Sequence, residues 1–372
     1  MKVIELFAGI GSPRKALEKL NIHHKVIAFS EIDRFAIDSY RAIHNDFLTP
    51  NLGDIEKIKE LPETDLLIYG SPCQDISIAG KHQGIQEGTR SGLLLEVLRL
   101  LENYKERKKL PKYLLLENVA NILSKNHRWE FQNYLVFLEK LGYKNFYKVL
   151  NALNYEIPQN RERLFCLSIL DDKVKYNFPG PKKLNILLKD LLEKEVDEKY
   201  FINEEKTKAF IEKYKDKILE IENLEKVNLI GSLSEKNSQG ERIYMPDVSV
   251  TLSSQGGGLG AKTGLYLVGL LDGHGVQRGR IYSPSGTIGS LTSTDYKDPP
   301  KIFTDYRIRR LTPHECFRLM GFTDNDFDKV KALGMSDTQL YKQAGNSIVV
   351  NVPEAIFKSL FLEEEIGEYK LF

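Results

Sequence analysis

The sequence predicts a doubly wound α/β domain with a mostly parallel sheet, joined to a smaller, glycine-rich domain that contains β structure. Short, continuous apolar runs of strand length recur in the first half of the 372 residues, and segments with helical spacing separate them. Apolar strands that alternate with helices are typical of a parallel sheet covered on both faces. Ligands of such a sheet bind beyond the carboxyl ends of its strands.

The expected elements follow one another in a regular order. The first four strands are expected at residues 2–7, 24–30, 65–70 and 112–118, and helical spacing is seen, for example, in 12–20 and 91–104. Two further strands, at 144–153 and 163–170, flank a polar turn and are expected to run antiparallel to one another. From about residue 305 the pattern becomes helical again.

Composition indicates a globular protein that does not span a membrane. No stretch approaches the roughly 18 uncharged apolar residues that a membrane helix needs, so we expect a cytoplasmic protein with no membrane partner. The three cysteines, Cys73, Cys166 and Cys316, are far apart, and none belongs to a C-x-x-C pair. Neither a disulfide framework nor a bound metal is therefore expected.

The chain changes in character after residue 180. Between 182 and 226 there are 11 Lys and Arg against 12 Asp and Glu, and we expect a charged, helical lead-in over 181–230. Residues 231–310 carry 10 basic against 7 acidic residues, which is a weak indication that this part faces phosphates.

A repeat is visible in the glycine-rich part of the chain. Residues 231–289 hold 13 of the 27 glycines, and the stretches 240–258 and 279–295 resemble one another, with Arg242 and Arg280 set 38 residues apart. Each stretch is interpreted as a β hairpin, with a chance likeness between two β segments as the alternative. We expect 181–324 to form the smaller domain.

A glycine turn separates the first strand from the first helix. The sequence "ELFAGIGSPRKAL" places Gly9 and Gly11 there, and such a turn lets a ligand approach the backbone closely. Glu31 ends the second strand 22 residues after Gly9, where a carboxylate can accept both hydroxyls of a ribose. A nucleoside cofactor is favoured, with a dinucleotide or a tight turn without a ligand as alternatives. Asp54, in "GDI", is interpreted as a third polar strand end, placed for an adenine amino group.

Cys73 follows Pro72 just after the third strand, in "LLIYGSPCQDISIAGKHQG". A free cysteine is usually a small buried hydrophobic residue. However, residues 74–91 are too polar and too rich in glycine to be core, so a thiol at the carboxyl edge of the sheet is favoured. About 3% of an unperturbed thiol is ionised at pH 7, and neighbouring cations or helix amides raise that fraction.

Further polar residues are expected at the same edge of the sheet. Glu117 and Asn118 end the fourth strand, although a carboxylate there also suits a helix cap. Arg161 and Arg163 stand two residues apart, so in an extended segment both side chains point to one face. A surface ion pair is the alternative for these two arginines.

Taken together and in order, these segments resemble the successive motifs of the DNA (cytosine-5)-methyltransferases. The motifs are "ELFAGIGS", "SEIDRFA", "GDI", "GSPCQDISIAG", "LLENV", "QNRERLF", "RIRRLTPHECFRLMGF" and "QAGNSIVVNV". The resemblance covers residues 1–170 and 305–360. It implies a Rossmann-like, class I S-adenosylmethionine-dependent methyltransferase domain over 1–180 plus 325–372. The family's target-recognition domain falls on 181–324.

The resemblance also implies the chemistry of the reaction. In the family a thiolate adds to carbon-6 of a cytosine that is flipped out of the duplex, which matches Cys73. A carboxyl group that hydrogen-bonds ring nitrogen 3 matches Glu117, and an arginine that holds the cytosine oxygen matches Arg163. Arg161 is a weaker candidate for a role at the same site.

The same resemblance implies S-adenosyl-L-methionine as cofactor and S-adenosyl-L-homocysteine as product. Ile32 stands where the family commonly has an aromatic residue, so packing against adenine is expected to be weaker on that side. The cofactor residues carried over are Phe7, Ala8, Gly9, Gly11, Glu31, Ile32, Asp54, Ile55, Pro72 and Asn346. The candidate DNA contacts are Gln74, Ser77, Lys81, Arg242, Arg278 and Arg280.

The resemblance implies double-stranded DNA as the partner, bound by a monomer and read by residues 231–300. The compact chain resembles the restriction-modification or phage type, so a cognate restriction endonuclease that acts separately is a further candidate partner. The alternatives are a transfer RNA cytosine-5 methyltransferase, a catalytically silent DNA-binding module and a nicotinamide-dependent oxidoreductase. The recognised DNA sequence is not predicted.

Overall fold

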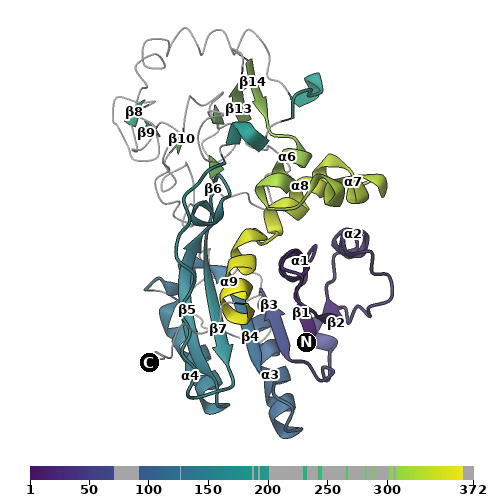
Figure 1. The fold of residues 1–372 in the computed structure, drawn as a ribbon, viewed down its shortest axis with the longest axis vertical. Helices are drawn as coiled ribbons and strands as arrows, with labels where there is room; N and C mark the ends of the chain where they lie inside the picture. The colour runs from purple at the N-terminus through teal and green to yellow at the C-terminus, as the bar shows by residue number, and fades with distance from the viewer. Residues whose placement is uncertain are drawn as a thin grey trace, which may run out of the picture.

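A computed structural model of the chain describes the larger domain almost completely (Figure 1). The described residues are 1–70, 92–125, 127–186, 188–191, 193–200 and 311–362, together with the backbone of seven short strands between 229 and 310. The predictions for residues 71–91, which include Cys73, lie outside the described residues. The same holds for Arg278 and Arg280.

The larger domain is built on a six-stranded sheet with the strand order β2-β1-β3-β4-β7-β5. Strands β1 to β4 run parallel, whereas β7 runs antiparallel to both of its neighbours, β4 and β5. The predicted parallel sheet and the antiparallel last pair are therefore confirmed. The strands are β1 Lys2–Leu6, β2 Lys25–Ser30, β3 Leu66–Tyr69, β4 Tyr113–Val119, β5 Lys144–Asn151 and β7 Glu162–Ile169.

Helices cover both faces of this sheet because successive side chains of its buried strands point to opposite sides. In β1, Val3 belongs to the hydrophobic cluster shared with α1, α2 and α9, whereas Ile4 belongs to the cluster shared with α3 and α4. The helices are α1 Ser12–Lys19, α2 Arg34–His44, α3 Gly92–Glu106, α4 Arg128–Lys140, α6 Pro313–Leu319, α7 Asp324–Ala332, α8 Asp337–Asn346 and α9 Asn351–Phe361.

Short elements connect the main ones. They are β6 Gln159–Asn160 and the 3₁₀ helices η1 Ile55–Lys57, η2 Ala120–Leu123, η3 Ala152–Tyr155, η4 Leu188–Leu191 and η5 Glu198–Tyr200. The two last 3₁₀ helices are what the structure describes of the expected helical lead-in over 181–230, of which 201–228 lie outside the described residues.

Short strands make up the described part of residues 229–310. They are β8 Leu229–Ser232, β9 Arg242–Tyr244, β10 Leu265–Tyr266, β11 Ile281–Tyr282, β12 Ile288–Gly289, β13 Lys301–Thr304 and β14 Arg307–Arg310. In the second repeat, β11 pairs with β13 and β12 pairs with β6, so these two strands lie in different sheets. The two hairpins stay a prediction, and this pairing does not favour the second one.

The return of the chain into the larger domain occurs earlier than the expected boundary at 324. Leu311, Phe317 and Met320 are fully buried in the cluster that also holds Val3 of β1. This packing favours a boundary near residue 310.

One edge of the sheet collects the carboxyl ends of the four parallel strands. Because β7 is antiparallel to β4, its first residues lie at the same edge, and Arg163 is in register with Val119. Every described motif that follows a strand in the first half of the chain is thus brought to this edge.

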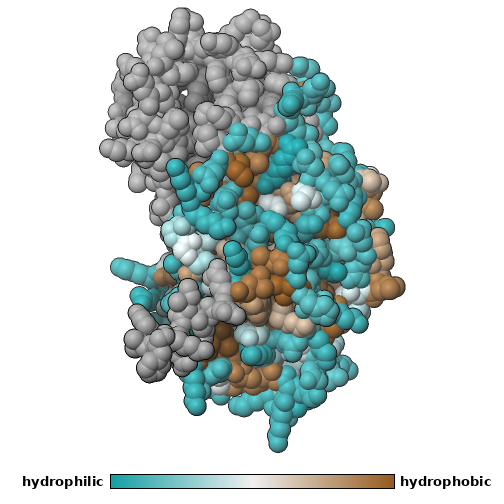
Figure 2. Space-filling model, viewed as in Figure 1, coloured by the Kyte–Doolittle hydropathy of each residue, from teal (hydrophilic) through white to brown (hydrophobic). Residues whose placement is uncertain are grey.

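The viewed face of the described part is mostly hydrophilic, with a hydrophobic patch near its middle, in the region of α9 (Figure 2). No helix among the described residues is long and apolar enough to cross a membrane.

Candidate active site

The glycine turn between β1 and α1 folds back onto the end of β2. Gly9 and Gly11 have φ angles of +54° and +79°, which residues with side chains rarely adopt. The Ala8 amide donates to the Ser30 carbonyl at 3.0 Å, and the Gly11 amide donates to Ala8 at 2.9 Å. Phe7 has a φ of 55°, which costs a non-glycine residue about 1–3 kcal/mol and occurs mainly at functional sites.

Within the described part of the chain, the hydrogen bonds to the Glu31 carboxylate at this turn come from backbone amides. Its Oε2 accepts from the Gly9 amide at 2.8 Å, and its Oε1 accepts from the amides of Ile32 at 2.8 Å and Asp33 at 2.9 Å. These three backbone amides therefore fix the orientation of the carboxylate. The resemblance assigns a ribose-binding acid to this position.

The interpretation of "GDI" as a strand end is wrong. Only Asn51 makes a bridge, with Phe29 of β2, and Asp54 instead caps η1 by accepting from the Glu56 amide at 3.1 Å. The misreading arose because a polar residue before an apolar one looks the same in sequence at a strand end and at a helix cap.

Asn51, which the sequence analysis did not single out, holds the backbone around Glu31. Its Oδ1 accepts from the amides of Glu31 at 3.1 Å and Gly53 at 3.0 Å, and its Nδ2 donates to the Glu31 carbonyl at 3.0 Å. Asn51 thereby ties the loop that carries Asp54 to the end of β2. The sequence does contain one indication of this role, because an asparagine two residues before a glycine is typical of a turn in which its side chain accepts from the glycine amide.

The residues around the turn leave room for a ligand. Among the described residues, a Cβ atom built on Gly9 or Gly53 would meet no atom within 4 Å, so this part of the structure leaves the space above both backbones open. Ile32 is 76% exposed, Phe7 and Ala8 are half-buried, and Ile55 is buried. Apolar side chains beside a fixed carboxylate and open glycines fit a nucleoside.

The segment around Asn346 reaches the same turn from the far end of the chain. Asn346 ends α8 and is exposed, and the next residue, Ser347, places its hydroxyl 2.6 Å from that of Ser12 at the start of α1. Arg161 is buried, and its Nη2 donates to the carbonyls of Gly345 at 3.1 Å and Ser347 at 2.9 Å. Arg161 therefore supports this segment.

Glu117 and Arg163 form an ion pair at the opposite part of the same edge. Arg163 Nε lies 3.2 Å from Glu117 Oε1, and the two side chains are 19% and 15% exposed. A Cβ atom built on Gly70 would lie 3.2 Å from Glu117 Oε2, so the carboxylate approaches the backbone that leads to Cys73 three residues later.

Burial raises the pKa of Glu117, while the charges of Arg163 and Arg161 oppose this change. The net direction is upward, so the carboxyl group keeps its proton to a higher pH than a free glutamate. A protonated carboxyl group is able to donate a hydrogen bond, which a carboxylate cannot do.

Several predicted site residues cannot be placed. Those outside the described residues are Pro72, Cys73, Gln74, Ser77, Lys81, Arg278 and Arg280, and for Arg242 the structure describes the backbone only, as the first residue of β9. Within the described residues, no group of three or more metal-ligating side chains is arranged to hold an ion. The absence of a metal stays a prediction for the whole chain.

The family model for C-5 cytosine-specific DNA methylases matches residues 1–362. The chain belongs to this family. It is similar to the type II methyltransferase M2.ScrFI of Lactococcus lactis subsp. cremoris, with 34% identity over 97% of this chain and 99% of the relative. The orphan methyltransferase M.SPRI of Bacillus phage SPR is 32% identical over 97% of each chain. Type II methyltransferase M.HhaI of Haemophilus parahaemolyticus is 32% identical over 96% of this chain and 93% of the relative.

Solved structures show the same fold. Dnmt2 methyltransferase of S. pombe has a TM-score of 0.64 at 19% identity over 97% of this chain and 98% of that chain. A DNA modification methyltransferase from an E. coli prophage has a TM-score of 0.61 at 20% identity, over 97% of this chain and 98% of that chain.

The predicted family, fold class and enzyme class are thus confirmed. This DNA cytosine methyltransferase acts on DNA, and its family and fold imply the use of S-adenosylmethionine.

Proposed function

We propose that this methyltransferase modifies carbon-5 of a cytosine that is flipped out of a short, specific duplex DNA sequence, through a covalent bond to Cys73. The observation that carries the proposal is the Glu117–Arg163 pair, which lies against Gly70 and so beside the chain that leads to Cys73. A hydrogen-bond donor and a cation at this point suit a pyrimidine ring.

The role of Cys73 follows from the chemistry of cytosine, whose carbon-5 is a poor nucleophile. The Cys73 thiolate forms a bond to carbon-6, and the electron pair of the ring's carbon–carbon double bond moves onto carbon-5 and the adjoining ring atoms. Carbon-5 is then able to accept a methyl group. Loss of the carbon-5 proton and cleavage of the carbon–sulfur bond restore the double bond and release Cys73 as a thiolate.

Glu117 and Arg163 stabilise the charge that develops on the ring. The protonated Glu117 donates a hydrogen bond to ring nitrogen 3, where negative charge collects after the thiolate adds. Arg163 donates to the cytosine oxygen and keeps Glu117 in place through their 3.2 Å contact. Arg161 acts through the backbone of Gly345 and Ser347, so we assign it a positioning role.

S-adenosylmethionine supplies the methyl group when bound. Glu31 accepts hydrogen bonds from the ribose hydroxyls, and Gly9 and Gly11 let the cofactor lie close to the backbone. Asp54 and Asn51 belong to the loop that faces the adenine. Phe7, Ala8, Ile32, Ile55, Pro72 and Asn346 complete the proposed cofactor site.

DNA is read by the glycine-rich part of the chain. Residues 231–300 recognise the sequence, with Arg242, Arg278 and Arg280 as candidate contacts to guanine or to phosphates. Gln74, Ser77 and Lys81 belong to the segment that closes on the flipped base, whose extrusion costs about a few kcal/mol. We propose that the enzyme acts on DNA as a monomer. A cognate endonuclease that acts separately is not required for this, since several relatives are named orphan methyltransferases.

The test uses the purified full chain and S-adenosylmethionine with a labelled methyl group. We expect label in duplex DNA and none in transfer RNA, and bisulfite sequencing of the product then gives the modified base and its context. Cys73→Ser should abolish transfer while cofactor and DNA binding stay largely intact. Cys166→Ala is the matched control, because Cys166 is fully buried in the core. Wild-type turnover by Cys73→Ser, or label in transfer RNA alone, would overturn the proposal.

A further inference from the structure

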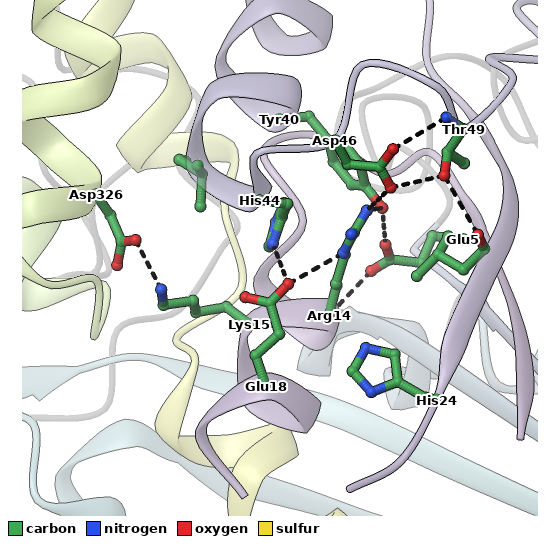
Figure 3. Close-up of polar contacts among 12 residues, drawn as sticks. Glu5, Arg14, Lys15, Glu18, His24, Tyr40, His44, Asp46, Thr49 and Asp326 are labelled. Atoms are coloured by element: carbon green, nitrogen blue, oxygen red, sulfur yellow. Dashed lines mark hydrogen bonds and ion pairs between the residues drawn. The ribbon is translucent and has the colours of Figure 1, made fainter. Parts of the chain in front are cut away.

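A largely buried polar network joins β1, α1 and α2 next to the glycine turn (Figure 3). It begins at Glu5, a residue of β1 next to the end of the strand, which is only 1% exposed. The Tyr40 hydroxyl donates to Glu5 Oε2 at 2.6 Å, and the Arg14 amide donates to Oε1 at 3.2 Å. Burial raises the pKa of Glu5. Burying a carboxyl group in a core strand costs free energy unless the group is fully hydrogen-bonded, so the presence of Glu5 at this position suggests a specific role for the network.

Arg14 extends this network from β1 to both neighbouring helices. Its Nη1 donates to Asp46 Oδ2 at 2.8 Å, just after α2, and its Nε donates to Glu18 Oε1 at 3.1 Å, one turn further along α1. The Arg14 side chain is 11% exposed and that of Asp46 is 18% exposed, so this contact is largely shielded from water, whereas Glu18 is 32% exposed. Together they fix the position of α2 relative to α1.

His44, the last residue of α2, carries this network to the glycine turn. Its fully buried ring places Nδ1 2.8 Å from Glu18 Oε1 and Nε2 3.3 Å from the carbonyl oxygen of Ile10. Ile10 stands between Gly9 and Gly11. Both partner atoms are acceptors, so each of the two contacts is a hydrogen bond when the ring nitrogen that faces it carries the hydrogen.

The His44 ring also explains why position 11 is a glycine. A Cβ atom built on Gly11 would lie 2.3 Å from His44 Nε2, in addition to the unfavourable φ of +79°. The histidine ring thus occupies the space that a side chain at position 11 would need.

We propose that His44 is a positioning residue for the cofactor. Its Nε2 holds the Ile10 carbonyl, which fixes the peptide between Gly9 and Gly11. The Gly9 amide, one residue earlier, donates to Glu31 Oε2 at 2.8 Å. His44 thereby keeps Glu31 directed toward the ribose before the cofactor arrives. The inference rests on the proposed function, in which the glycine turn and Glu31 hold S-adenosylmethionine.

The two contacts of His44 are separable by substitution. The amide nitrogen of asparagine stands close to the place of Nδ1, so His44→Asn keeps the donor to Glu18 and loses the one to Ile10. The amide nitrogen of glutamine stands close to the place of Nε2, so His44→Gln keeps the donor to Ile10 instead. His24→Gln is the control, because the hydrogen bond of His24 in the described structure is a local one, 2.7 Å from Nδ1 to the Ile22 carbonyl, in the connection before β2.

The measurements are the Kd of S-adenosylmethionine by calorimetry, the KM values for cofactor and DNA, kcat, and the thermal midpoint. We expect His44→Asn to raise the Kd and KM of the cofactor about tenfold, as for the loss of one buried hydrogen bond. His44→Gln should raise them about threefold or less. The KM for DNA, and kcat at saturating cofactor, should stay unchanged in both variants and in the control.

Equal cofactor affinities of His44→Asn and His44→Gln would overturn the inference, as would a loss of affinity that merely follows the thermal midpoint. Glu31→Ala separates this outcome from failure of the proposed function. If Glu31→Ala binds the cofactor as tightly as the wild type, the proposed cofactor site itself is wrong. If Glu31→Ala weakens binding and His44→Asn does not, only the role of His44 is wrong.

Discussion

Two glutamates stand on the same edge of the sheet, yet the chain holds them in opposite ways. Glu31, after β2, accepts hydrogen bonds from the amides of Gly9, Ile32 and Asp33. Glu117, in β4, has Arg163 at 3.2 Å and surroundings whose burial raises its pKa. Amide donors present Glu31 as an acceptor, whereas desolvation prepares Glu117 to carry a proton. Under the proposed function, one fold thereby uses the same type of side chain once for binding and once for proton donation.

The largest effect should come from removing Glu117. We expect Glu117→Ala to lower kcat about 1000-fold, because the charge on the cytosine ring then has no donor. Glu117→Gln should retain part of the rate, since its amide nitrogen donates but carries no transferable proton. Single-turnover methyl transfer at saturating cofactor measures both. Equal rates of the two variants and the wild type would remove Glu117 from the reaction.

Removing the Glu31 carboxylate should chiefly weaken the binding of S-adenosylmethionine. Glu31→Ala is expected to raise the Kd of S-adenosylmethionine about 100-fold, because two ribose hydroxyls lose a charged acceptor. The KM for DNA should change little, and calorimetry with cofactor alone measures the effect. If Glu31→Ala lowered kcat while leaving the Kd unchanged, the assignment of the two glutamates would have to be reversed.

The pH dependence of the rate tests the raised pKa of Glu117 directly. The protonated fraction of a carboxyl group falls about tenfold for each pH unit above its pKa, so kcat should fall as the pH rises through this value. Because burial raises the pKa, this decline occurs at a higher pH than for a free glutamate. Glu117→Gln has no such group and should lack the decline. Its persistence in that variant would assign it to another residue.

Two further carboxylates, of Glu193 and Asp324, flank His314, and changes at this more exposed cluster should have the smallest effect. His314 Nδ1 lies 3.0 Å from Glu193 Oε1, and its Nε2 lies 2.8 Å from Asp324 Oδ1, which joins the segment before residue 200 to α6 and α7. The hydrogen bond to Glu193 raises the pKa of His314, and the same bond lowers the pKa of Glu193. Asp324 is 57% exposed, and solvent weakens its contribution.

The pH dependence of stability follows from these directions. The stabilisation by His314 is complete below its unfolded pKa and is lost as the pH rises through the raised folded value. The stabilisation by Glu193 is complete above its unfolded pKa and is lost as the pH falls through the lowered one. We therefore expect the contacts of His314 with Glu193 and Asp324 to stabilise the fold most at mildly acidic pH. His314→Gln should lower the thermal midpoint by about 1–2 °C near pH 6 and by less at pH 8.5. An equal loss at both pH values would contradict this.

Arg161 and Arg163 show where sequence reasoning succeeds and where it stops. Their spacing placed both on one side of an extended segment, and both charges do act on Glu117. Only Arg163 contacts that carboxylate, however, while Arg161 bonds to carbonyls of Gly345 and Ser347. A spacing of two residues describes direction along a strand, but it contains no information about a partner more than 180 residues away.

Local pattern and motif order by themselves determined the parallel strands, the glycine turn, Glu31 at the end of β2 and the family of the chain. These features depend on residues that are close in sequence, where periodicity and backbone preference act. Only the tertiary structure decided that Asp54 caps a helix, that Asn51 ties two loops together, and that His44 reaches behind the turn to Ile10. The contacts of Asn51 and His44 join elements that become neighbours only when the sheet and its covering helices have packed. The Asp54 cap is local, but a polar residue before an apolar one looks the same in sequence at a strand end and at a helix cap.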